Sequence, residues 1–168
     1  MFCKKCLINP NFHSFVKFGK IASTNLFYTS PARSMDYNND GTKLENFKLH
    51  LRDTNGAPWI WVIDCNGMTV NDYTDLNFTI DLLKALSKDY TDTLISIMFI
   101  NPNTWVKTTV GACKKMFKSG IFDRVKYCEG SPIELFLMYE KLNIPTASIK
   151  WLISIDAGKA LPTLPLII

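Results

Sequence analysis

Four short apolar runs recur along the chain and are separated by longer amphipathic segments. These runs are rich in β-branched and aromatic residues, which is typical of strands. The run at 59–64 (WIWVID) does not alternate apolar and polar positions, which indicates a strand covered on both faces of its sheet. The predicted strands are residues 26–29, 59–64, 95–100 and 125–128.

Helical periodicity fills the intervals between the strands. Capping boxes at 42–45 and 131–134 mark the starts of two helices, and two more are predicted at 72–90 and 104–119. Asn55-Gly56 is expected to end the helix that begins at the first capping box. The apolar positions expected to face the core are Leu44, Phe47, Leu51, Leu76, Ile80, Leu83, Tyr90, Leu135, Tyr139 and Leu142.

This alternation of strands and helices predicts an α/β fold. We expect a mostly parallel sheet of about four to five strands, with right-handed crossover helices on its faces. The regular pattern defines one domain at 21–156. Residues 1–20 are expected to form an N-terminal extension that is either flexible or a targeting segment, and residues 157–168 a C-terminal tail.

Composition supports a globular protein. The chain has 168 residues, of which 47% are hydrophobic and 20% charged, and these values exclude a disordered chain. Apolar stretches fall short of the roughly 20 residues that span a bilayer. The net charge of +4 permits contact with an acidic membrane surface or with nucleic acid and requires neither, and we expect no nucleic-acid partner.

The first 35 residues carry five basic residues and no acidic residue. This is loosely the composition of a mitochondrial transit peptide, although Asn9-Pro10-Asn11 would interrupt an early amphipathic helix. We expect cytoplasmic localisation with peripheral contact with membranes, and mitochondrial import is the less favoured alternative.

Five cysteines, an odd number in apolar surroundings, indicate reduced thiols. Cys3 and Cys6 form a lone C-x-x-C pair. A zinc site needs two further ligands, and His13 and His50 do not have the usual spacing of a second pair. We therefore expect free thiols near the N-terminus, and no metal site or cofactor.

The segment around Asp64 raises the question of enzymatic chemistry. It resembles the first motif of haloacid-dehalogenase-type phosphatases, which carries a second carboxylate two positions after the first. Asn66 occupies that position here, and an amide cannot transfer the proton of the leaving group. The segment therefore lacks the second carboxylate of that motif, and residues 111–115 also lack the first glycine and the hydroxyl of a phosphate-binding loop.

Four segments together resemble the CRAL-TRIO domain, a lipid-transfer fold, over residues 21–156. They are WVIDCNGMT at 61–69, YTDTLISIMFINPN at 90–103, FDRVKYCEGSPIEL at 122–135 and LNIP at 142–145. The resemblance is nearest to the divergent branch that includes the BCH domains of Rho-regulatory scaffold proteins. The chain lacks both the separate N-terminal helical lobe and the Tyr-Gly-Gly that usually follows the closing Leu-Pro.

The resemblance implies a non-enzymatic protein that binds a hydrophobic ligand such as a phospholipid and touches anionic membranes transiently. The alternative that it implies is a BCH-type scaffold for small GTPases, their regulators or another such domain. It also implies that Asp64 and Gly67 shape a turn, Asp64 by accepting backbone N–H bonds and Gly67 by its backbone freedom.

In CRAL-TRIO proteins the helix that corresponds to residues 104–119 is the gate over the lipid cavity. Its apolar stripe and its basic stripe lie about a quarter turn apart, as in helices that lie at membrane surfaces. An ordinary crossover helix would show the same pattern. The expected ligand-facing residues are Val106, Val110, Cys113 and Phe117, and the expected membrane-facing residues are Lys107, Lys114 and Lys118.

Overall fold

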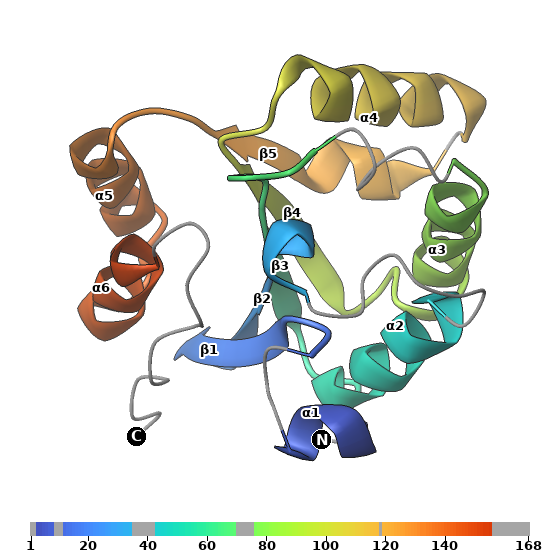
Figure 1. Ribbon diagram of the computed structural model, residues 1–168, viewed down its shortest axis with the longest axis horizontal. Coiled ribbons are helices and arrows are strands. Elements are labelled where there is room, and N and C mark those ends of the chain that lie inside the picture. The colour runs from blue at the N-terminus through green and yellow to red at the C-terminus, as the bar shows by residue number, and fades with distance from the viewer. Residues whose placement is uncertain (1–2, 9–11, 35–42, 70–75, 118, 156–168) are drawn as a thin grey trace.

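A five-stranded, mostly parallel sheet lies at the centre of the computed structural model (Figure 1). The structure describes residues 3–8, 12–34, 43–69, 76–117 and 119–155. The strands lie side by side in chain order, and β1 is antiparallel to β2 whereas the other neighbours are parallel. Their bounds are β1 Phe15–Ile21, β2 Thr24–Thr29, β3 Trp59–Asp64, β4 Leu94–Ile100 and β5 Val125–Cys128.

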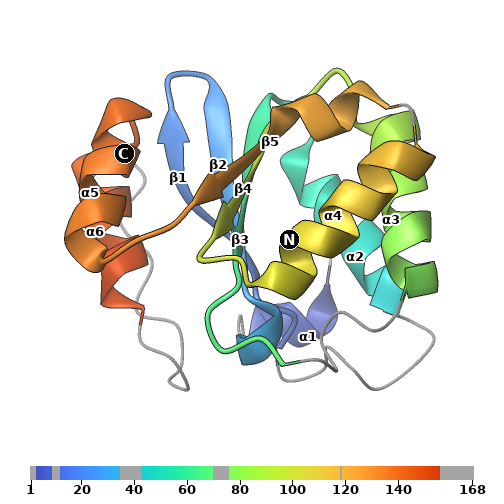
Figure 2. The same cartoon turned by 90° about the horizontal axis from the view of Figure 1, so that it is seen from above.

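Helices cover both faces of this sheet (Figure 2). The three crossover helices α2, α3 and α4 lie on one face because successive right-handed crossovers that advance in one direction must all pass over the same side. Helices α5 and α6 cover the opposite face, and the short α1 lies beside α2. The bounds are α1 Lys4–Ile8, α2 Lys43–Leu51, α3 Leu76–Asp89, α4 Thr104–Met116, α5 Pro132–Lys141 and α6 Thr146–Ser154, with 3-10 turns at Pro31–Arg33, Arg52–Thr54 and Gly120–Arg124.

Strand periodicity divides the core into two clusters, because successive side chains on a strand point to opposite faces. On β3, Trp59 and Trp61 pack beneath α2 and α3, whereas Val62 faces α5 and α6. The α5–α6 side is closed by stacking of Trp151 on Phe18, with ring centroids 5.3 Å apart. The continuous apolar run of β3 is thus covered on both faces of the sheet, as its sequence predicts.

Local signals set several element ends. Asn55 adopts a left-handed conformation (φ 51°) that ends the turn after α2. The capping box at α5 is complete, because the Ser131 hydroxyl accepts from the Glu134 backbone N–H and the Glu134 carboxylate accepts from the Ser131 backbone N–H. The α/β fold and its mostly parallel sheet, predicted from the alternation of strands and helices, are confirmed. The predicted capping residue Thr42 and the first predicted turn of the helix at 72–90 lie outside the described residues.

Two elements of the fold differ from the expectation. β1 begins at Phe15, so most of the strand falls within the predicted extension 1–20. The sequence does not predict this strand, because its apolar residues are interspersed with two lysines and a glycine. α6 follows α5 although no helix was expected there, and its buried Ile149 and Trp151 pack against the sheet. The predicted tail, 157–168, lies outside the described residues.

Smaller differences concern helix faces and ends. The deepest residues of α3 are Leu82 and Leu86, not the predicted stripe through Ile80. α4 ends at Met116, three residues earlier than predicted. Within the described part of the chain, no helix combines the length and the apolar character needed to cross a bilayer.

Candidate ligand-binding cavity

An apolar cavity of about 150 Å³ lies between the sheet and the helical layer of α2, α3 and α4. Its floor consists of strand side chains that point to this face, among them Trp61, Ile97 and Phe99. Its walls come from the inner faces of the three helices. The other lining residues are Thr29, Pro31, Phe47, Ile63, Cys65, Met68, Phe78, Thr79, Leu82, Leu83, Leu86, Val106, Thr109, Val110, Cys113, Ile121, Phe122 and Val125.

Helix α4 closes one wall of the cavity. Three of the four residues expected to face a ligand, Val106, Val110 and Cys113, line it. Phe117 follows the helix end and packs in the same apolar cluster without lining the cavity. The Asn103 side chain accepts from the Val106 backbone N–H at 3.0 Å, which fixes the start of the helix. Burial raises the pKa of the Cys113 thiol, so it remains an uncharged part of the wall.

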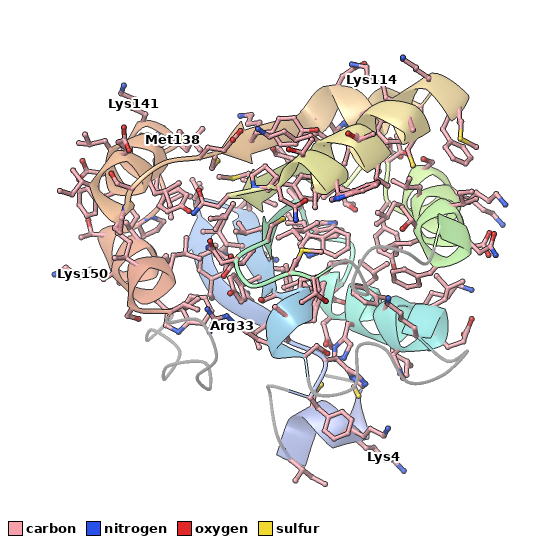
Figure 3. The ribbon with its side chains drawn as sticks, turned by 45° about the horizontal axis from the view of Figure 1, so that its top comes forward. Lys4, Arg33, Lys114, Met138, Lys141 and Lys150 are labelled. Atoms are coloured by element: carbon pink, nitrogen blue, oxygen red, sulfur yellow. The ribbon has the colours of Figure 1, made fainter. Side chains whose placement is uncertain are left out.

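Lys114 points outward from α4, and both lysines of the basic stripe within the described residues form exposed ion pairs (Figure 3). Lys107 Nζ is 2.6 Å from Glu129 Oε2, and Lys114 Nζ is 3.1 Å from Asp123 Oδ1. Both pairs are largely exposed, so each contributes at most about 1 kcal/mol to stability and opens readily. Lys118, the third residue of the expected basic stripe, lies outside the described residues.

On the opposite face of the sheet, Asp64 ends β3 as a buried carboxylate. It accepts from the Tyr28 hydroxyl at 2.6 Å and from the Asn66 backbone N–H at 2.9 Å. The second of these is the hydrogen bond of an Asx turn. Arg33 Nε lies 3.9 Å away and supplies a compensating charge. Gly67 continues the turn at φ 75°, a conformation that favours glycine.

These contacts hold the Asp64 carboxylate at the end of β3, where it stabilises the turn that follows. Burial and the neighbouring carboxylate raise the pKa of Tyr28, which therefore stays protonated and remains a donor. The Asn66 side chain donates to the same carboxylate at 2.7 Å, where a phosphatase would need an acid. A second, more polar cavity of about 210 Å³ begins at this network and continues between α5 and α6.

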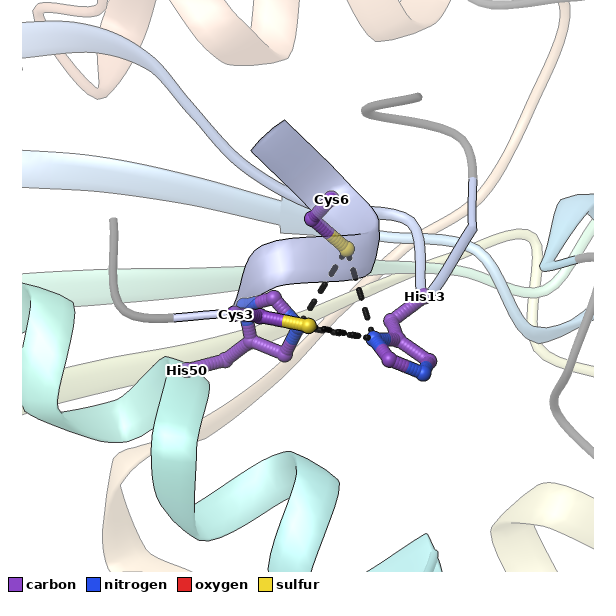
Figure 4. Close-up of side chains that lie close together, drawn as sticks. All are labelled: Cys3, Cys6, His13 and His50. Carbon is purple, nitrogen blue, oxygen red and sulfur yellow. Dashed lines mark hydrogen bonds between the residues drawn. The ribbon is translucent and has the colours of Figure 1, made fainter. Parts of the chain in front are cut away.

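The N-terminal thiols differ most from their predicted environment. Cys3, Cys6, His13 and His50 come together in the structure (Figure 4), although their sequence spacing suggested no common site. All four are buried, so Cys3 and Cys6 are not exposed thiols. Burial raises the pKa of Cys6 to about 12, and burial together with the nearby His13 lowers the pKa of His50 to about 4. The signal in the sequence was the C-x-x-C pair together with two histidines, but their convergence depends on the tertiary fold.

Comparison with known proteins identifies a family that matches the fold described above. A profile described as a divergent CRAL/TRIO domain matches residues 25–148, about three quarters of the chain, whereas a search of curated proteins gave no match. The matched region runs from β2 into α6 and contains all three crossover helices. Domains of this family generally bind lipids or other small ligands and are not enzymes. The chain therefore belongs to the divergent CRAL/TRIO domain family.

Proposed function

We propose that this protein binds a hydrophobic ligand in the cavity beneath α4. The observation that carries the proposal is the apolar lining of that cavity, to which the sheet and three helices all contribute. Apolar walls favour apolar ligands because they offer few hydrogen-bond partners to water or to a polar group. Three threonines are the main polar side chains in the lining.

The size of the cavity limits what it holds in this conformation. A volume of about 150 Å³ is enough for a benzene-sized molecule, whereas pockets for larger ligands occupy roughly 300–1,000 Å³. A phospholipid would therefore require α4 to move outward. Gly111 in the middle of α4 lowers the helix propensity, and a side chain there would contact nothing within 4 Å, so packing does not require the glycine.

Ligand binding can be tested with a fluorescent fatty acid and with native mass spectrometry of protein purified from cells. We expect cis-parinaric acid to bind, and Val110→Phe to weaken binding about tenfold or more, equivalent to about 1.4 kcal/mol, because the ring occupies the cavity. Ala112→Phe adds the same ring on the exposed side of α4 and should leave binding unchanged. A folded wild-type protein that neither binds the probe nor retains an apolar ligand would contradict the proposal.

Contact between α4 and an anionic membrane is the second part of the proposal. Trp105 and Met116 are 62% and 61% exposed at the two ends of the helix, and Lys107 and Lys114 lie between them. At about 100° per residue the apolar pair and the lysine pair border the exposed face of α4 on opposite edges, so a lipid surface that meets this face would contact both. The acidic partners of the lysines must be displaced by lipid head groups, which costs little because the pairs are exposed.

The membrane contact can be tested by sedimentation with phosphatidylserine liposomes. Changing Lys107 and Lys114 together to Gln should weaken binding by up to about thirtyfold, at about 1 kcal/mol per lysine. The matched control changes Lys48 and Lys84 to Gln, because these lysines also pair with acidic residues on exposed helix faces. An equal loss in both variants would indicate general charge attraction and would contradict a specific role for α4.

A protein-interaction scaffold of BCH type is the second candidate. It is favoured by Ile133 and Leu137, which lie one turn apart on α5 and are 74% and 52% exposed. Adjacent exposed apolar side chains are a common feature of protein interfaces. Binding of a purified small GTPase or its regulator, lost on Leu137→Ser, together with the absence of any apolar ligand, would favour this candidate.

A further inference from the structure

The group formed by Cys3, Cys6, His13 and His50 has the composition of a metal site. Cys3 immediately precedes α1 and Cys6 lies in its middle, whereas His13 precedes β1 and His50 lies on α2. One ligand atom from each residue lies within 4.8 Å of the other three. Each residue is no more than 5% exposed. Three separate segments therefore place two sulfur and two nitrogen donors around one buried point (Figure 4).

The four side chains make more short contacts with one another than their protons and lone pairs can turn into hydrogen bonds. His13 Nδ1 lies 3.4 Å from Cys3 Sγ, 3.3 Å from Cys6 Sγ and 3.0 Å from His50 Nε2. Cys6 Sγ is also 3.4 Å from His50 Nε2. A ring nitrogen of a neutral imidazole offers either one proton or one lone pair, so Nδ1 can bond well to only one of these three neighbours. Convergence of this kind is expected where the donors share a central ion.

The separations also fit a tetrahedral metal centre. With Zn–S bonds of about 2.3 Å and Zn–N bonds of about 2.0–2.1 Å, tetrahedral angles place sulfur and nitrogen ligands about 3.5 Å apart and two nitrogen ligands about 3.3 Å apart. The observed distances of 3.3–3.4 Å and 3.0 Å fall short of these values by about 0.1–0.3 Å. Small side-chain adjustments would therefore admit the ion without movement of the three segments.

Charge and surroundings favour a closed zinc site. Two thiolates and two neutral imidazoles balance the charge of a divalent ion, which removes most of the cost of burying it. Asp53 Oδ2 lies 3.8 Å from His50 Nδ1, the ring nitrogen that faces away from the sulfurs, as carboxylates often do behind metal-bound histidines. The Phe15 ring stacks on His50 with centroids 5.5 Å apart and shields it from water. Four protein donors leave no open position for a substrate, which is typical of structural zinc.

We propose that Cys3, Cys6, His13 and His50 bind one zinc ion that fastens the N-terminal segment to α2. A tetrahedral set of two sulfur and two nitrogen ligands favours zinc over calcium, magnesium or manganese. The ion joins α1 and the chain before β1 to the helix that follows β2, and so holds the antiparallel edge of the sheet against the helical layer. Metal binding releases the thiol protons, and its free energy adds to the stability of the fold.

The test begins with the full-length chain, produced without a histidine tag in zinc-containing medium and kept reduced. Elemental analysis by mass spectrometry should find about one zinc per chain. Cys6→Ser and His50→Gln should each lose most of this zinc. Cys113→Ser and Cys128→Ser remove buried thiols outside the group and should retain it. Removing zinc with a chelator should lower Tm by roughly 5–15 °C, and adding zinc back should restore it.

Cobalt provides a test that does not depend on the folding of any variant. The wild-type protein reconstituted with Co²⁺ should show the visible bands of a tetrahedral ion and the near-ultraviolet charge-transfer bands of cobalt–thiolate bonds. A folded wild-type protein that takes up neither zinc nor cobalt would overturn the proposal. So would zinc that persists in folded Cys6→Ser and His50→Gln, or a Cys3–Cys6 disulfide in protein purified under reducing conditions.

Discussion

The hydrogen bond between Tyr28 and Asp64 gives the sharpest test of how the strand ends are held. Tyr28→Phe removes the hydroxyl and leaves the ring, which packs edge-on against Trp151 with centroids 5.2 Å apart. Both Tyr28 and Asp64 are buried, so water cannot replace the lost donor without opening the core. Asp64 keeps its bonds from Asn66 and the nearby Arg33 charge. The substitution therefore isolates one short bond to a buried carboxylate.

The expected loss follows from the charge on the acceptor. A hydrogen bond to a charged group contributes about 1.5–3 kcal/mol, more than a neutral one, and an O···O distance of 2.6 Å is typical of this class. We expect the free energy of unfolding to fall by about 2 kcal/mol. For a chain of this length, this corresponds to a decrease in Tm of about 4–8 °C.

Urea denaturation followed by circular dichroism measures this effect, with Tyr139→Phe as the matched control. Tyr139 is equally buried, but within the described residues its hydroxyl makes no hydrogen bond. Its substitution should change stability by less than about 0.5 kcal/mol. Equal losses in the two variants, or no loss in Tyr28→Phe, would refute the assignment of a strong bond to Asp64.

Two glycine substitutions should act in opposite directions. Gly19→Ala places a Cβ against the Ser148 hydroxyl, which itself donates to the Phe18 carbonyl in the core. Because this clash would push α6 away from β1, we expect the free energy of unfolding to fall by about 1–3 kcal/mol in urea denaturation. Gly111→Ala meets nothing within 4 Å in the middle of α4 and should instead stabilise the protein by about 0.5–1 kcal/mol. Stabilisation by Gly19→Ala would mean that α6 does not pack on β1 as described, and a clear loss in Gly111→Ala would mean that α4 is not helical there.

The sequence determined the elements whose signals are local or periodic. The apolar runs specified β3 and β4 closely, because an unbroken apolar run of that length is typical of a strand in a sheet whose two faces are both covered by helices. The capping box at Ser131 set the start of α5 within its own four residues. The alternation of these elements predicted the parallel sheet and placed α4 over an apolar face. Three of the four residues predicted to face a ligand line the cavity, because a helical stripe points in one direction whatever it packs against.

Only the tertiary structure decided which distant residues meet. β1 has a weak strand pattern and is specified by antiparallel pairing with β2, and α6 is held by side chains that fill the opposite face of the sheet. The volume of the cavity depends on how closely three helices approach the strands. His13 and His50 are 37 positions apart, and their nitrogens lie 3.0 Å from each other because α2 and the chain before β1 pack together. The periodicity of apolar residues predicts which way a side chain points within its own helix or strand. A site that joins several elements depends on how those elements pack together, and the spacing of its residues in the sequence does not encode that packing.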